Sequence, residues 1–339
     1  MPTASFPSRH LVASPDKFRG SASAAEVAGA VARAAGAAGW TCDEAPVADG
    51  GEGILEALGG SVRRARVRGP LGEAVEAEWR MLPGSTAVIE MAQAAGLERA
   101  GGAEWNDPMR ASTAGVGDLI SAALSARAEH IIVGMGGSAT TDGGLDCLNA
   151  LRPHVRLRGI DLVVAYDVST TFVDAATEFA PQKGASPAQV ELLRRRLERL
   201  AQIYSEEFGI DVSRISGSGA AGGLAGGLAA LGAKLVPGFE LVADAINLAE
   251  RIEGADLVIT GEGFLDEHSF QGKAVGGVVD LARAAGVPVL VVVGRVFGAH
   301  GVEAVSLADR FGLERAMDQP LECVTEAVAG HLAALPFAP

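Results

Sequence analysis

Short runs of almost wholly apolar residues recur along this chain of 339 residues, and they restrict the folds that it can adopt. Strands that are buried on both faces have sequences of this kind, and such strands belong to parallel sheets. The runs span residues 11–13, 86–91, 130–133, 161–165, 256–260 and 287–293. The chain is therefore expected to build a parallel or largely parallel sheet.

Helical stretches lie between these runs. Ser23 and Glu26 have the spacing of a capping box at the start of an alanine-rich helix, and Ser186 and Pro187 supply an N-cap and a first-turn proline for another. A third helix is expected over 273–286, with Gly286 as its C-cap. The second helix has one apolar stripe, formed by Val190, Leu193, Leu197, Leu200 and Ile203. Strands that alternate with helices predict the α/β class.

The pattern changes near residue 60. Residues 61–68 alternate charged and apolar side chains, which favours an antiparallel or edge strand over a central parallel one. We therefore expect the chain to leave its first sheet near this point. The length, at roughly 150 residues per domain, favours about two domains.

Charge and hydropathy exclude several classes of function. The net charge is −14, and a nucleic-acid partner requires a basic face, so none is expected. The longest aliphatic run is far shorter than the roughly 20 residues of a membrane-spanning helix. The first ten residues have no apolar core of a signal peptide, and the three cysteines are isolated. These features predict a cytoplasmic protein with neither membrane nor nucleic acid as a partner.

Glycine accounts for 45 residues, clustered where apolar runs end. α/β proteins often place phosphate-binding turns at such positions. The loop after the run 130–133 leads into a helix start, and its N–H and hydroxyl groups predict an anion site at Gly136, Gly137, Ser138 and Thr140. Asp142 in the same loop can hold a metal ion or accept a hydroxyl proton, or it can simply cap the helix.

Charged side chains follow the first strand. Asp16, Lys17 and Arg19 are expected at its carboxyl end, where open α/β sheets bind their ligands, and the two cations there suit a carboxylate or a phosphate. A solvated turn is the structural alternative. In the segment 48–53, Asp49 and a second acid lie beside three glycines, including Gly50 and Gly51, which suits Mg²⁺ or a polar substrate unless the segment is only a tight turn.

Two further sets of charges remain. Glu262, Asp266 and Lys273 follow the run 256–260 and resemble a metal and phosphate constellation, with a loop ion pair as the alternative. Lys183 precedes the helix that Ser186 caps, where it is either directed at a bound phosphate or is one more surface lysine.

The segment 217–223 has the form G-x-G-x-x-G, which is weak evidence because no good strand precedes it. A glycine-rich turn approached by a nucleotide or by another stretch of backbone fits it better than a dinucleotide fold, and Gly219 is the second glycine of this segment. The chain has no P-loop, no G-x-S-x-G motif and no protein-kinase motifs.

Anion-binding loops, carboxylates and lysines together indicate phosphoryl transfer.

Six of these segments, in this order, resemble the type-1 glycerate kinase family: residues 14–21, 48–53, 136–144, 181–185, 219–223 and 260–263. The resemblance implies phosphorylation of glycerate with ATP and Mg²⁺, usually at the 2-hydroxyl. It also implies two α/β domains with the active-site cleft between them. One would be Rossmann-like, with a parallel sheet built from residues 1–60 and 245–339, and the other would be an inserted domain of residues 61–244.

The resemblance also implies roles for particular residues. Glycerate binding is expected at Asp16, Lys17, Arg19, Asp49, Gly50 and Gly51. The nucleotide phosphates are expected at Gly136, Gly137, Ser138, Thr140, Lys183, Gly219 and Lys273. Mg²⁺ is expected at Glu262 and Asp266, and the catalytic groups are expected to be Lys17 and either Asp49 or Asp142, which the sequence does not distinguish.

The chain departs from the family pattern at two notable positions. Thr141 occupies a position that is usually Asn, and Phe264 occupies one that is usually Arg. Because the second change removes a cation beside a phosphate, a homologue that binds a hydroxy acid or nucleotide without turnover is an alternative. A dinucleotide-dependent oxidoreductase using residues 217–223 is another. The oligomeric state is left open, with a homodimer as one option.

Overall fold

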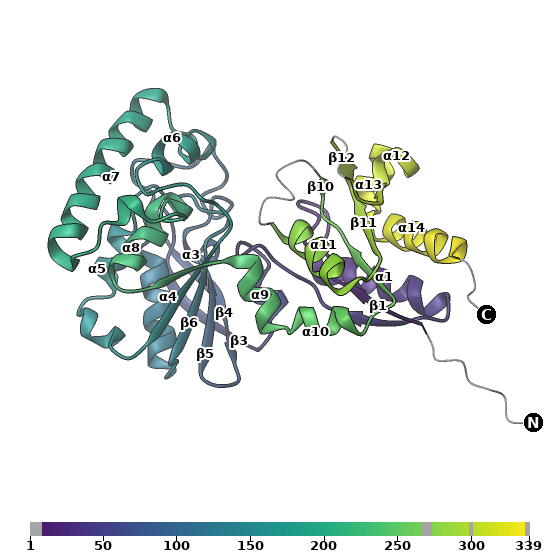
Figure 1. Ribbon diagram of the computed structural model, residues 1–339. Helices are drawn as coiled ribbons and strands as arrows, with labels where there is room; N and C mark the ends of the chain where they lie inside the picture. The colour runs from purple at the N-terminus through teal and green to yellow at the C-terminus, as the bar shows by residue number, and fades with distance from the viewer. Residues whose placement is uncertain (1–8, 266–272, 298–300, 336–339) are drawn as a thin grey trace, which may run out of the picture. The chain divides into compact units, whose positions relative to one another are not determined.

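The structure, a computed structural model, describes residues 9–265, 273–297 and 301–335. The chain divides into two units, one formed by Met1–Asp49 with Val242–Pro339 and the other by Gly50–Leu241 (Figure 1). Each unit has its own sheet with helices packed on it, so the predicted α/β class is confirmed. The domain limits that the sequence suggested stay a prediction.

The first unit contains a five-stranded parallel sheet. Its strands are β1 (His10–Ala13), β2 (Thr41–Glu44), β9 (Leu257–Thr260), β11 (Val289–Val293) and β13 (Ala304–Ser306), in the spatial order β13-β11-β9-β1-β2. Counted along the chain within this sheet, the order is 2-1-3-4-5, which is one of the two common orders of doubly wound folds. The order reverses between β1 and β9.

Helices cover both faces of this sheet. Leu290 and Val292 of β11 belong to a core shared with α1 (Ala24–Ala37) and α14 (Pro320–Ala334), whereas Val291 and Val293 pack against α11 (Ala274–Ala285). Since neighbouring side chains of a strand point to opposite faces, a strand covered twice must be apolar throughout. The uninterrupted run 287–293 is explained in this way.

The predicted helix ends of this unit are confirmed. Ser23 and Glu26 form the capping box of α1, and Gly286 is the left-handed C-cap of α11. The other described elements are α10 (Leu248–Glu253), α12 (Leu307–Phe311), α13 (Leu313–Asp318) and a small parallel pair of β10 (Phe264–Leu265) with β12 (Arg295–Val296). Helix α9 (Gly238–Ala245) contains the point at which the chain passes between the units.

The second unit contains a six-stranded mixed sheet. Its strands follow one another in space as in the chain: β3 (Ser61–Arg68), β4 (Ala74–Leu82), β5 (Thr86–Glu90), β6 (His130–Gly134), β7 (Asp161–Tyr166) and β8 (Lys234–Pro237). The pairs β3–β4 and β4–β5 are antiparallel, and the remaining pairs are parallel. The alternating stretch 61–68 is thus an antiparallel edge strand, as predicted.

The helices of this unit are α2 (Ile54–Leu58), α3 (Ala92–Ala95), α4 (Ala114–Ser125), α5 (Leu145–Ala150), α6 (Ala175–Phe179), α7 (Pro187–Phe208) and α8 (Leu224–Ala230). The main core packs the sheet against α4 and α8, and a second core forms under α7. Within α7, Leu193, Leu197 and Leu200 are buried along the predicted stripe, and Ser186 caps the helix. Within the described ranges, no helix is both long and apolar enough to cross a membrane.

Candidate functional site

The first unit brings charged residues together where its strand order reverses. The carboxyl ends of β1 and β9 are neighbours in the sheet, and doubly wound folds bind ligands at this position. The loops that follow these strands are joined by backbone hydrogen bonds, from Ser14 N–H to the Ile259 carbonyl and from Asp16 N–H to the Gly261 carbonyl, both at 2.8 Å. Side chains that follow both strands are therefore held close together.

Asp16, Lys17 and Asp49 form the centre of this group. The Lys17 ammonium lies 3.9 Å from Asp16 Oδ1 and 3.8 Å from Asp49 Oδ1. Burial, together with the charges of Asp49 and Glu262, raises the pKa of Asp16 to about 7, although the charge of Lys17 opposes this shift. The site thus contains a carboxyl group that exchanges its proton near neutral pH, beside a cation and two more carboxylates.

The other charges predicted for this unit are less tightly held. Arg19 is exposed in the turn after β1, and Lys273 occupies the N-cap position of α11 without a side-chain capping bond. Asp266 lies outside the described residues. Over the described ranges, no group of three or more His, Cys, Asp or Glu side chains is arranged to hold a metal ion.

In the second unit, two predicted glycine loops contact each other. Met135 N–H donates to the Gly50 carbonyl at 2.9 Å, and a Cβ atom on Gly136 would lie 2.5 Å from Gly51 Cα. Gly137 has a φ of +69°, and a side chain there would collide with Glu52. At Gly136 the loop after β6 therefore packs against the backbone of the loop that begins at Gly50, which leaves no room for a larger residue.

Glu90, which the sequence analysis did not single out, holds one of these loops in place. It ends β5, and its Oε1 accepts hydrogen bonds from Gly53 N–H at 2.8 Å and Leu55 N–H at 3.2 Å, at the start of α2. Burial raises the pKa of this carboxyl, while the two backbone donors lower it. In the sequence, Glu90 is visible only as an acid near the end of the apolar run 86–91, and this pattern does not show which groups it binds.

Lys183 is buried beneath the loop after β6, so the surface-lysine alternative is wrong. Its side chain donates to the Thr140 carbonyl at 2.6 Å and to Ser138 Oγ at 3.3 Å, and the residue is 4% exposed. Burial lowers the pKa of Lys183 to about 7, and the nearby charge of Asp142 opposes this shift. Lys183 therefore stabilises the loop from within.

Asp142 is engaged on both oxygens. Its Oδ2 accepts from Thr113 N–H at 2.9 Å and from Thr113 Oγ1 at 2.7 Å, and its Oδ1 accepts from Gly144 N–H at 3.0 Å. These bonds tie the end of the glycine loop to the start of α4. Neither α4 nor α5 has a side-chain N-cap bond, so these contacts join the loop to α4 without capping a helix, and the catalytic role of Asp142 stays a prediction.

The segment 219–223 packs against protein backbone. Gly219 N–H donates to the Thr170 carbonyl at 3.0 Å, and a side chain at Gly222 would collide with the Thr140 carbonyl. Of the two partners considered for this segment, another stretch of backbone is the one observed. The segment therefore packs against the loop that contains Thr140.

The structure thus gathers the sequence-predicted residues into two groups. In the first unit, Lys17 pairs with Asp16 and Asp49, and the charges of Asp49 and Glu262 act on Asp16. In the second unit, contacts within the glycine loops involve Gly50, Gly51, Gly136, Gly137, Ser138, Thr140 and Lys183.

Comparisons with known proteins agree with this arrangement. The family model described as the glycerate kinase family matches residues 11–154 and 152–333. Glycerate 2-kinase of Escherichia coli K12 is 38% identical over 87% of this chain and 89% of its own, and glycerate kinase of Halalkalibacterium halodurans is 40% identical over 81% and 84%. A crystal structure of a candidate glycerate kinase 2 from Salmonella typhimurium LT2 superposes with a TM-score of 0.80, at 34% identity over 96% of this chain and 99% of that one. The chain therefore belongs to the glycerate kinase family.

Proposed function

We propose that this protein transfers the terminal phosphoryl group of ATP to a hydroxyl group of glycerate, giving 2-phosphoglycerate. The observation that carries the proposal is the group of Asp16, Lys17 and Asp49 at the reversal of strand order in the first unit. A cation beside two hydrogen-bond acceptors suits a small acid that bears hydroxyl groups. The names of relatives in the same family supply the substrate.

Lys17 and the exposed Arg19 bind the carboxylate of glycerate in this proposal. Asp49 and Asp16 accept hydrogen bonds from its hydroxyl groups, and Asp49 orients the one that attacks. Asp142 is the weaker candidate because both its oxygens already accept protein hydrogen bonds. Phosphoryl transfer depends mainly on positioning and on charge stabilisation, so one well-placed acceptor suffices.

The loop after β6 binds the phosphates of ATP. Gly136 and Gly137 in this loop are at least partly exposed and offer backbone N–H groups, whereas the hydroxyl groups of Ser138 and Thr140 are bonded to each other, and that of Ser138 also to the buried Lys183. Donors of this kind form anion sites in α/β proteins. Lys183 contributes by fixing the loop, and its charge is favourable when a phosphate lies nearby.

The carboxylates of the first unit suit Mg²⁺. Asp16, Asp49 and Glu262 offer oxygen atoms. Burial, with the charges of Asp49 and Glu262 adding to it, raises the pKa of Asp16, and a divalent cation would oppose this shift. Mg²⁺ usually binds to one or two carboxylates together with substrate phosphates. Glu262 and Asp266 are the proposed ligands. When bound, the ion would neutralise charge on the transferred group.

The test is a kinase assay with ATP, Mg²⁺ and glycerate, coupled to enolase. Enolase consumes 2-phosphoglycerate directly, so product formation without phosphoglycerate mutase identifies the hydroxyl that is phosphorylated. Asp49→Asn is expected to lower kcat by about 10²-fold, in the range of a lost positioning group. Glu253→Gln, which changes an exposed carboxylate at the end of α10, serves as the control and keeps wild-type activity. Wild-type protein that forms neither ADP nor phosphoglycerate would refute the proposal.

A further inference from the structure

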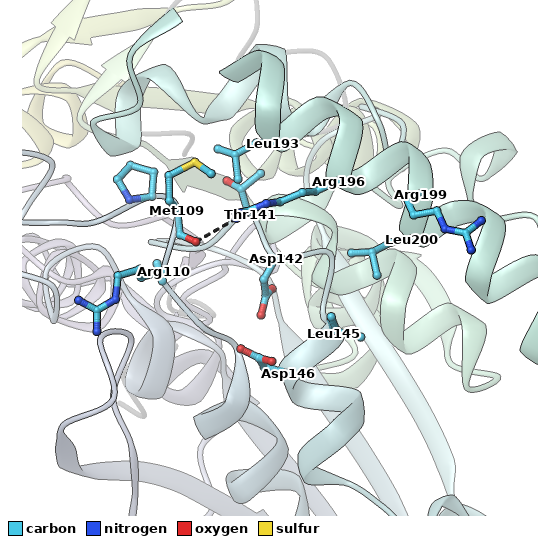
Figure 2. A pocket seen from close by; sticks show the side chains of 12 residues that line it. Met109, Arg110, Thr141, Asp142, Leu145, Asp146, Leu193, Arg196, Arg199 and Leu200 are labelled. Carbon is cyan, nitrogen blue, oxygen red and sulfur yellow. Dashed lines mark hydrogen bonds between the residues drawn. The ribbon is translucent and has the colours of Figure 1, made fainter. Parts of the chain in front are cut away.

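The second unit contains a pocket of about 380 Å³ at the end of the glycine loop (Figure 2). It lies between the stretch around Met109, the start of α5 and one side of α7. Its volume falls within the range of small-molecule sites, about 300–1,000 Å³. The lining residues are Pro108, Met109, Arg110, Ala111, Thr141, Asp142, Leu145, Asp146, Leu193, Arg196, Arg199 and Leu200.

The interior of this pocket is acidic at one end and apolar at the other. In Figure 2 the carboxylate of Asp142 lies near the centre of the lining residues and that of Asp146 lies below it. The guanidinium groups of Arg110 and Arg199 extend away from them, whereas that of Arg196 is turned to the Met109 carbonyl. Asp146 Oδ2 accepts from Ser112 Oγ at 2.6 Å, and a carboxylate has capacity for further donors. An occupant that brings hydroxyl groups is favoured over an anion, which these carboxylates would repel.

The apolar wall suits a flat, weakly polar ring. Met109 lies on one side, with its carbonyl bonded to Arg196 at 3.1 Å, and Leu193 and Leu200 of α7 line another. Leucine and methionine side chains form the apolar lining that is usual in cofactor pockets. An occupant with both a ring and hydroxyl groups would match the whole interior.

Thr141 supplies an independent sign of a ligand. Its hydroxyl is buried, the residue is 2% exposed, and Oγ1 has no hydrogen-bond partner among the described residues. Buried hydroxyl groups nearly always have a partner, so an occupant of the pocket that Thr141 lines would complete the pairing.

The position of the pocket indicates which ligand this is. Thr141 is three residues beyond Ser138 in the loop proposed to hold phosphates, and three residues span at most about 11 Å. We infer that the pocket binds the nucleoside part of the phosphate donor. Its ribose hydroxyls donate to Asp146, its base packs against Met109, Leu193 and Leu200, and Thr141 bonds to it. This inference rests on the proposed function, because it assumes that the phosphates lie on that loop.

Leu145→Trp tests the inference by filling the pocket from its rim, since Leu145 is 38% exposed. The KM for ATP is expected to rise at least tenfold, while the KM for glycerate and kcat at saturating ATP stay within twofold. Inorganic tripolyphosphate, which has no nucleoside, should inhibit the variant and the wild type with the same Ki. Leu192→Trp is the matched control, because Leu192 is 50% exposed on α7 and does not line the pocket.

Asp146→Asn provides a second variant of nearly unchanged shape, for which the KM for ATP should rise about fivefold. If circular dichroism shows that Leu145→Trp does not fold, Asp146→Asn alone tests the inference. An active wild type with an unchanged KM for ATP in the folded variants would overturn the inference and leave the proposed function standing. A rise in the Ki of tripolyphosphate equal to the rise in the KM would also overturn it.

Failure of the proposed function would look different. If the wild type forms no phosphoglycerate, binding of adenosine is measured by calorimetry for the wild type, Leu145→Trp and Leu192→Trp. Adenosine binding that Leu145→Trp alone abolishes would support a nucleoside pocket. No binding to the wild type would overturn it.

Discussion

Replacing Lys183 with methionine would remove a buried ammonium group from beneath the glycine loop of the second unit. The lysine donates to the Thr140 carbonyl and to Ser138 Oγ, at 2.6 and 3.3 Å, and methionine keeps a similar apolar chain without donors or charge. Since burial lowers the pKa of Lys183 to about 7, the folded protein releases this proton at a much lower pH than the unfolded chain does. The substitution should therefore change how stability depends on pH.

The sign and size follow from proton linkage. Below pH 7 Lys183 is protonated in both the folded and the unfolded protein, and burying its charge lowers the free energy of unfolding by the full amount. Between about pH 7 and 10 the unfolded chain binds one more proton at this lysine than the folded protein does, so the free energy of unfolding rises with pH, by about 1.4 kcal/mol per unit. From pH 7.5 to 9.5 this rise amounts to roughly 2 kcal/mol, and Lys183→Met should lose it.

The assay is urea unfolding at pH 7.5, 8.5 and 9.5, followed by circular dichroism under reducing conditions. All other titrating groups are shared, so the difference in unfolding free energy between wild type and variant isolates Lys183. The lost hydrogen bonds add an offset of about 1–3 kcal/mol that does not vary with pH. Lys234→Met, which removes an ammonium paired with Asp161 at the surface, should keep the wild-type slope. A difference between wild type and Lys183→Met that is constant across this range would refute the reasoning.

Two further predictions concern the packing of the same loops. Gly136→Ala would place a Cβ atom 2.5 Å from Gly51 Cα and should cost about 1–3 kcal/mol of stability in thermal or urea unfolding. Gly36→Ala in α1, where nothing lies within 4 Å of the new Cβ atom, should instead stabilise the protein by up to about 1 kcal/mol. Equal effects of the two substitutions would contradict the close-packing argument. Glu90→Ala removes the acceptor of two backbone N–H groups and should lower the free energy of unfolding by about 2 kcal/mol. Glu90→Gln should recover part of this loss because it keeps one carbonyl oxygen. A Glu90→Ala variant as stable as the wild type would show that these bonds do not hold α2 in place.

The sequence predicted those strands whose burial is uniform. β11 is covered on both faces, so all its side chains are apolar and the run is visible without a structure. β2, at the edge of the same sheet, has the sequence Thr-Cys-Asp-Glu and buries none of it fully, so no pattern marks it as a strand. β8 ends in a proline and is also an edge strand. Edge strands depend on their backbone pairing, which the sequence does not display.

The position of the charged loops was predictable, but the environment of each side chain was not. Asp16 and Lys17 follow a buried strand, and strand ends converge at one edge of a parallel sheet, so their proximity to Glu262 follows from the pattern. The burial of Lys183 and the saturation of Asp142 depend on backbone groups far away in the chain. Because most lysines are exposed, no local rule would have placed this one in the interior.

The glycines combine two physical causes that the sequence alone cannot separate. Gly20 has a φ of +80° with nothing near its Cβ position, so glycine is favoured there by backbone conformation. Gly136 and Gly219 have ordinary φ values, and glycine is required there because another stretch of backbone occupies the space of a side chain. A high glycine content after apolar runs therefore indicates close backbone packing as readily as a phosphate site. The case for phosphate at the loop after β6 accordingly rests on the donors that the loop presents and on the buried lysine beneath it, and the number of its glycines adds little.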